Sequence, residues 1–152
     1  AKEYGISKAM ATAEEIIADP TVDVVDICSP NPYHFEVAKA AIAEMVRQKP
    51  TPIIEDGIMQ KGVIVRILLL PGHVAEAKLA VKYIYETYGD SVYISLMSQY
   101  TPDFVDKEKY PELARRVTSF EYKSVLDKAI ELGFDGFFQG RSSASAKFTP
   151  DF

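Results

Sequence analysis

The chain contains very little cysteine and histidine. Cys28 is the single thiol among 152 residues, which excludes an internal disulfide and any iron–sulfur or zinc site built from several thiolates. The two histidines, His34 and His73, have no second histidine or cysteine at the spacing that metal ligands need. The sequence therefore predicts no metal site.

Long apolar runs, an excess of basic charge and two loop motifs are missing as well. The longest apolar run, at residues 63–71, is interrupted by Arg66 and is too short to span a bilayer. The net charge of −5, with acids and bases interspersed, argues against a nucleic-acid or anionic-membrane surface. Neither G-x-G-x-x-G nor G-x-S-x-G occurs. These absences predict no nucleic-acid or membrane partner and no catalytic residues, in a soluble chain that lacks a signal-peptide pattern and is cytoplasmic by default.

What the chain does have is enough apolar residues for a core. A hydrophobic content of 47% predicts a single soluble domain over residues 1–152. Along it, short β-rich runs alternate with helical patterns. Strands are predicted at residues 8–11, 22–28, 63–70, 91–99 and 136–139, helices at 14–19, 32–47, 74–88 and 120–133, a loop at 48–61 and a short helix near 111–116.

Capping residues mark the helix boundaries. Thr12 with Glu15, and Thr118 with Glu121, form the T-x-x-E pattern of a capping box, in which each side chain accepts from the other residue's backbone N–H. Apolar residues at helical spacing predict one buried stripe on each of two helices. These stripes are Phe35, Ala38, Ile42 and Met45 in one helix, and Ala77, Val81, Ile84 and Tyr88 in the other. The predicted helix stops are Asp19-Pro20, Gly89 and Gly133.

Hydrophobic strands joined by helical crossovers predict a mostly parallel sheet with helices on both faces. About five strands are too few for a closed eight-stranded barrel. The predicted fold is therefore a three-layer α/β/α sandwich, flavodoxin-like or Rossmann-like. The strand order stays open, and exposed edge strands are compatible with either a monomer or a weak dimer.

In such a sheet, ligands bind beyond the carboxyl ends of the strands. The polar groups there, together with helix N-termini, fit an anion such as phosphate or sulfate. The alternative is that polar residues gather there because turns need them. The basic residues Arg115, Arg116 and Lys123 are interpreted as part of an ordinary solvated face. The strand-end groups are Ser29-Pro30-Asn31, Pro71-Gly72-His73, Ser98-Gln99-Tyr100 and Gln139-Gly140-Arg141.

Residues 1–44 resemble the middle of the Rossmann domain of the glucose-fructose oxidoreductase and inositol dehydrogenase family. The matching strings are TAEEII at 12–17, DPTVDVV at 19–25 and SPNPYH at 29–34. That family also needs the glycine-rich dinucleotide loop, which this chain lacks. The last string lies along the dinucleotide in that family, which implies cofactor-facing remnants at Ser29, Pro30, Asn31 and His34.

From about Phe35 onward, the chain resembles the C-terminal part of a radical S-adenosylmethionine protein related to pyruvate formate-lyase activating enzymes, a partial TIM barrel. The matching strings include EDGIMQKGVIVRILLLPGH at 55–73, SLMSQYTP at 95–102 and TSFEYKSVLDKAIELGFDGFFQ at 118–139. That family binds its iron–sulfur cluster through a C-x-x-x-C-x-x-C loop, which a single cysteine cannot build. Remnants of its cofactor pocket are implied at Arg66, Pro71, Gly72, Ser98 and Gln99.

The two resemblances overlap in the helix that begins near Asn31. A seam within residues 31–45 would join a Rossmann piece, 1–44, to a partial-barrel piece, 35–152, because both parents contain βαβ units of the same handedness. We interpret the chain as an engineered chimera, a folded scaffold with no natural biochemical function, no cofactor and no expected partner. The alternative is a residual weak binder of S-adenosylmethionine, or of an adventitious anion, at the strand ends. A working dehydrogenase is disfavoured because its glycine loop and catalytic lysine are missing.

Overall fold

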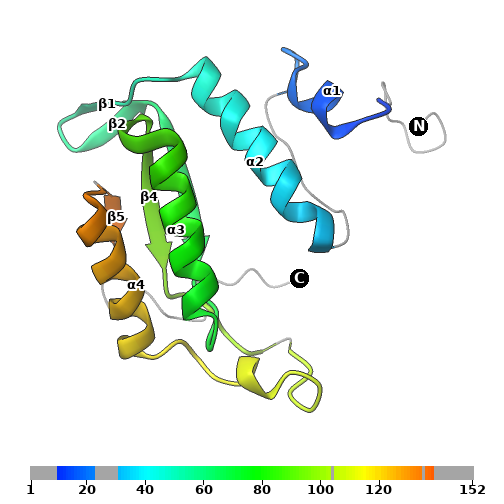
Figure 1. Cartoon of the computed structure of the whole chain (residues 1–152), viewed down its shortest axis with the longest axis vertical. Helices are drawn as coiled ribbons and strands as arrows, with labels where there is room; N and C mark the ends of the chain where they lie inside the picture. Colours follow the sequence, from blue (N-terminus) through cyan, green and yellow to red (C-terminus); the bar gives the residue numbers. More distant parts are fainter. Residues whose placement is uncertain (1–9, 23–30, 104, 135, 139–152) are drawn as a thin grey trace. The chain divides into compact units, whose positions relative to one another are not determined.

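The computed structural model describes residues 10–22, 31–103, 105–134 and 136–138 (Figure 1). The chain divides into two compact units, Ala1–Pro50 and Thr51–Phe152, and each is described by itself. The first contains helices α1 (Ala13–Ile17) and α2 (Asn31–Gln48). The second contains strands β1 (Ile53–Glu55), β2 (Ile58–Lys61), β3 (Val63–Leu68), β4 (Val92–Met97) and β5 (Gly136–Phe138), helices α3 (Val74–Tyr88) and α4 (Ser119–Leu132), and short 3-10 turns η2 (Gly89–Ser91) and η3 (Pro111–Leu113).

Helix α1 begins at a threonine cap, as predicted, although the capping box is incomplete. The Thr12 hydroxyl oxygen accepts from the Glu15 N–H at 3.2 Å. The Glu15 carboxylate, however, accepts from the Ala11 N–H at 3.0 Å, one residue before the predicted partner. The helix ends at Ile17, ahead of Asp19-Pro20, where the residue before proline avoids helical geometry.

Helix α2 is present, but its predicted apolar stripe is not fully buried. Phe35 is 55% exposed and Met45 is 47% exposed, while Ala38 and Ile42 are half-buried. The described residues of this unit form two helices, α1 and α2. The helix starts at Asn31 itself, one residue earlier than predicted, which is within the usual uncertainty of helix ends.

A β-hairpin occupies most of the segment predicted to be a loop at residues 48–61, so that prediction is wrong. Strands β1 and β2 pair antiparallel around Asp56 and Gly57, whose φ angles are 52° and 77°. Two successive residues with positive φ characterise a type I′ turn, whose twist matches that of the flanking strands. The Asp-Gly pair between the apolar runs Ile53-Ile54 and Ile58-Met59 is the sequence signal for this hairpin.

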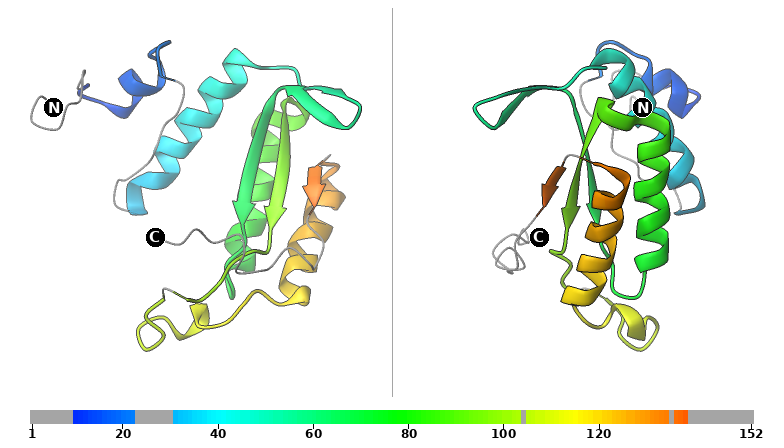
Figure 2. Two further views of the ribbon diagram at one scale, coloured as in Figure 1. Left: turned by 180° about the vertical axis from the view of Figure 1, so that it is seen from behind. Right: turned by 60° about the vertical axis from the view of Figure 1, so that its left-hand side comes forward.

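The remaining strands form a three-stranded parallel sheet in the order β3-β4-β5. Val63 lies opposite Val92 and Leu68 opposite Met97, while Ile94 and Leu96 of β4 lie opposite Gly136 and Phe138 of β5. Helix α3 joins β3 to β4, and α4 joins β4 to β5. Right-handed crossovers between consecutive neighbours place both helices on the same face, as Figure 2 shows. The predicted α/β class with parallel strands is therefore confirmed.

The core of this unit lies between the sheet and its two helices. Val63, Ile94 and Leu96 are buried on the strands, and Val81, Ile84, Val125 and Ala129 are buried on the helices. Alternate residues of β3 point to the other face, where Ile64 and Leu68 are 38% and 44% exposed. In the described part of this unit, helices cover one face of the sheet, so the three-layer sandwich stays a prediction.

The helix stops and several strands agree with prediction. Helix α3 ends at Gly89 and helix α4 at Gly133, whose φ angles of 50° and 90° favour glycine. On α3, Val81 and Ile84 of the predicted stripe are buried. Residues 23–28 of the strand predicted at 22–28, and residues 8–9 of the one predicted at 8–11, lie outside the described residues, so the pairing of these strands stays a prediction.

Candidate functional site

A polar region of the second unit lies where β3 and β4 end, at the edge of the sheet where ligands bind in parallel α/β proteins. The Leu69 N–H donates to the Met97 carbonyl at 2.9 Å, which carries the β3–β4 pairing one residue further. Pro71 is fully buried beneath this edge, and Gly72 is exposed on it. The turn between β3 and α3 therefore presents the backbone N–H of Gly72 near the start of α4.

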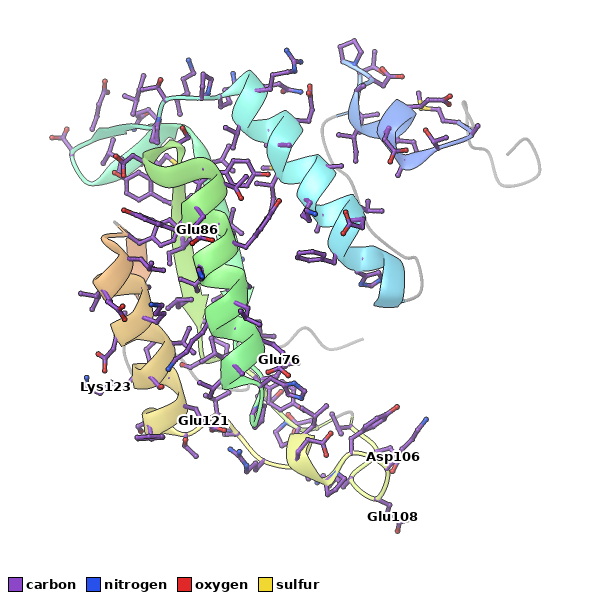
Figure 3. All side chains as sticks on the ribbon, viewed as in Figure 1. Glu76, Glu86, Asp106, Glu108, Glu121 and Lys123 are labelled. Atoms are coloured by element: carbon purple, nitrogen blue, oxygen red, sulfur yellow. The ribbon has the colours of Figure 1, made fainter. Side chains whose placement is uncertain are left out.

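The Glu121 carboxylate is the centre of this region. Its Oε1 accepts from the Gly72 N–H at 2.8 Å and from Arg115 Nη2 at 2.7 Å. Its Oε2 accepts from Arg115 Nη1, the Thr118 N–H and the Thr118 hydroxyl, each at 2.8 Å. We call Gly72, Arg115, Thr118 and Glu121 the Glu121 cluster. Figure 3 labels Glu121 in the first turn of α4.

The local sequence accounts for two of the four residues of the cluster, Thr118 and Glu121. Thr118 is the N-cap of α4, with an extended backbone, and its hydroxyl oxygen accepts from the Glu121 N–H at 3.2 Å. The Glu121 side chain accepts from the Thr118 N–H in return, so the predicted capping box is confirmed. A capping carboxylate is normally solvated, whereas Glu121 is only 8% exposed. The additional partners come from parts of the chain that the capping pattern does not specify.

Arg115 is one of those partners. It is exposed, as the prediction of a solvated face implies, but its guanidinium also forms a two-pronged ion pair with Glu121, one nitrogen to each oxygen, which the sequence interpretation did not foresee. The fork of a guanidinium matches the two oxygens of a carboxylate, which makes this the stronger kind of ion pair. Lys123 does lie on the exposed face, where it pairs with Asp127 at 2.7 Å.

The electrostatics keep Glu121 ionised. The Arg115 guanidinium is the largest influence, and it holds the pKa of the Glu121 carboxyl well below its usual range. Burial opposes this shift, while the hydrogen bonds from Thr118 and Gly72 reinforce it. A carboxylate that stays charged at ordinary pH and accepts five hydrogen bonds has no proton to donate and few lone pairs left for a metal. Its chemistry here is structural.

This shift predicts acid sensitivity. Because the folded pKa of Glu121 lies below the unfolded value of about 4.3, its contribution to stability is complete above about pH 5 and is lost as pH falls further. We expect the urea midpoint of Glu121→Gln to fall less between pH 7 and pH 3 than that of the unaltered chain. Arg47 and Gln48 lower the pKa of Glu44 to about 2. Glu44 is present in both proteins, so it contributes equally to the pH dependence of their urea midpoints. Parallel curves would contradict the prediction.

The structure brings one predicted remnant of the radical-enzyme pocket, Gly72, into the Glu121 cluster, with Pro71 beside it in the chain. Arg66 lies elsewhere, on the exposed face of β3, with its Nη2 2.9 Å from the Met97 sulfur. Ser98 and Gln99 are half-buried directly after β4. The next residue, Tyr100, donates its hydroxyl to the Leu113 carbonyl at 2.8 Å, which ties down the long connection to α4.

The predicted dinucleotide-facing remnants belong to the first unit. Asn31 and His34 lie in the first turn of α2, and His34 is half-buried. Ser29, Pro30 and Cys28 lie outside the described residues. Among the residues that the structure does describe, no three histidine, cysteine or acidic side chains lie close enough together to bind a metal. Within the same residues, no helix has the length and apolarity needed to cross a membrane.

The cluster was only partly visible in the sequence. The T-x-x-E pattern marks Thr118 and Glu121, but it does not specify Arg115, six residues before Glu121, or Gly72, 49 residues before it. Comparison of the chain with protein-family models, curated proteins and solved structures gives no significant match. The two family resemblances therefore stay predictions, and function has to be argued from the residues themselves.

Proposed function

We propose that this chain is a folded α/β scaffold that catalyses no reaction, an engineered chimera whose seam lies within residues 31–45. The observation that carries the proposal is the Glu121 cluster. At the edge where a parallel α/β protein binds its ligand, the Gly72 N–H and the Arg115 guanidinium already have a partner within the chain. Groups that would recognise a phosphate or a carboxylate of a ligand instead hold the fold together.

The sequence supports the same conclusion. One cysteine cannot hold the iron–sulfur cluster of the radical-enzyme parent, and no glycine-rich loop is present for a dinucleotide. For the complete fold we propose the three-layer, flavodoxin-like or Rossmann-like sandwich of about five mostly parallel strands. Strands β3, β4 and β5 supply three of them.

A second candidate is weak binding of S-adenosylmethionine or an anion. The observation that favours it is Arg66, whose side chain is exposed on the sheet and hydrogen-bonds only to the weak acceptor Met97 in the described structure. A guanidinium in that position attracts a carboxylate or phosphate oxygen. The missing iron–sulfur cluster, which in the parent family holds the methionine end, argues for low affinity.

Thermal unfolding separates the two candidates. We expect one circular-dichroism melting temperature for the chain that does not move with millimolar NAD or S-adenosylmethionine. A ligand at about 100 times its dissociation constant would add about 2.7 kcal/mol, or several degrees. A saturable rise with S-adenosylmethionine that Arg66→Ala abolishes would overturn the scaffold proposal and establish the second candidate. A rise with NAD would overturn it in favour of the dehydrogenase parent.

A further inference from the structure

The donors of the Glu121 cluster form a cradle, and two of them have further support besides Glu121. The turn containing Gly72 is closed by a hydrogen bond from the His73 N–H to the Leu70 carbonyl at 3.2 Å. Arg115 also donates to the carbonyl of Arg116 at 3.2 Å. Thr118 occupies the N-cap position, directly before the first residue of α4. The turn at Gly72 and the Arg115 guanidinium therefore each keep one hydrogen bond that does not involve Glu121.

The chemistry of this cradle is that of an oxyanion site. It combines one full positive charge, two backbone N–H groups and a hydroxyl, drawn from two separate stretches of chain, Gly72 and residues 115–118. The fork of Arg115 sends one N–H to each of two oxygen atoms, which matches a carboxylate. The start of the 14-residue helix α4 adds a favourable field for negative charge. Without Glu121, the cradle would carry a net positive charge and no acceptor.

We propose that the cradle is a carboxylate-binding site that the chain fills with its own Glu121 side chain. The site goes beyond the scaffold function and does not depend on it. Solvent has access to the donors, because the Arg115 side chain is 46% exposed and both Gly72 and Thr118 are exposed. Glu121 itself is buried against them. A small carboxylate from solution reaches the same donors once the side chain is shortened.

Because Glu121 is tethered to the chain, the unaltered chain is expected to exclude free anions from the cradle. A carboxylate attached to α4 acts at an effective concentration at or above the millimolar range, whereas a free anion must be supplied at that level merely to compete. By pairing with Arg115, Glu121 occupies the site and blocks the binding of free carboxylates. Anion binding in the unaltered chain is expected to be undetectable at the cradle, whatever happens at Arg66.

The test is chemical rescue of Glu121→Ala by acetate. The substitution removes a CH₂–COO⁻ group, which acetate reproduces in size and charge. We expect sodium acetate, compared with sodium chloride at equal ionic strength and pH 7, to raise the melting temperature of Glu121→Ala saturably by about 4 °C. The unaltered chain is expected to respond equally to the two salts. An equal response of Glu121→Ala to both salts overturns the proposal.

Two variants control the experiment. Adding Arg115→Ala to Glu121→Ala removes the charged fork, and acetate should then have no specific effect. Glu131→Ala shortens another glutamate of α4, one that pairs with Lys128, and it should show no rescue either. If Glu121→Ala fails to fold in chloride, recovery of its far-UV circular dichroism by acetate supports the site, and failure to recover in acetate contradicts it.

Discussion

Replacing Glu121 by glutamine is expected to lower the free energy of unfolding of the second unit by about 3 kcal/mol at pH 7. The carboxylate accepts five hydrogen bonds, two of them from the Arg115 guanidinium. A glutamine keeps one acceptor oxygen but turns an NH₂ group toward other donors, and it leaves the charge of Arg115 without its counterion. Arg115 is partly solvated, which places the cost at the lower end for a broken buried pair.

Urea unfolding followed by circular dichroism measures this effect. Glu131→Gln is the matched control, because Glu131 lies on the same helix, is 69% exposed and pairs with Lys128 at 3.0 Å. An exposed pair of this kind contributes less than about 1 kcal/mol, so the control should behave nearly as the unaltered chain does. If the two variants lost stability equally, the assignment of Glu121 as the centre of the cluster would be wrong.

Shortening Leu96 to alanine is expected to cost about 3 kcal/mol or more. Leu96 is fully buried in the central strand β4, with strands on both sides and helices over its face. The substitution removes apolar contacts and leaves a cavity that the close-packed layer between the sheet and its helices cannot fill completely. The expected loss is a large part of the stability of a small domain.

Leu68→Ala is the control for this second prediction. It makes the same chemical change on the neighbouring strand β3, at a side chain that is 44% exposed. We expect it to cost less than half as much, since its burial is partial. Equal losses, measured as urea midpoints with unchanged slopes, would mean that the exposed face of β3 is covered in solution.

Local signals predicted the elements of the second unit well. Gly89 and Gly133 end α3 and α4 because each adopts a positive φ that other residues avoid, and this requirement is visible in the sequence. The capping box of Thr118 with Glu121 spans three residues and needs no tertiary information. The alternation of strands and helices likewise gave the parallel pairing of β3, β4 and β5.

The failures have two different causes. The hairpin around Asp56 and Gly57 was missed although its signal is local, because the polar residues beside it resemble a loop. The role of Arg115 was missed because its partner Glu121 lies six residues further on, a spacing that no capping or helical pattern links to it. The exposure of Phe35 and Met45 belongs with the second cause, because spacing identifies an apolar stripe and says nothing of what covers it.

The Glu121 carboxylate accepts hydrogen bonds both from a residue close to it in the sequence and from one far away. Its bonds to Thr118 span three residues, so they can form as soon as the first turn of α4 does. Its bond to Gly72 spans 49 residues and encloses α3 and β4. Loop closure of that length is slow and entropically costly, so this bond belongs to the late stage of folding. The start of α4 therefore reaches its full stability only when the sheet has formed. This coupling makes the unfolding transition more cooperative.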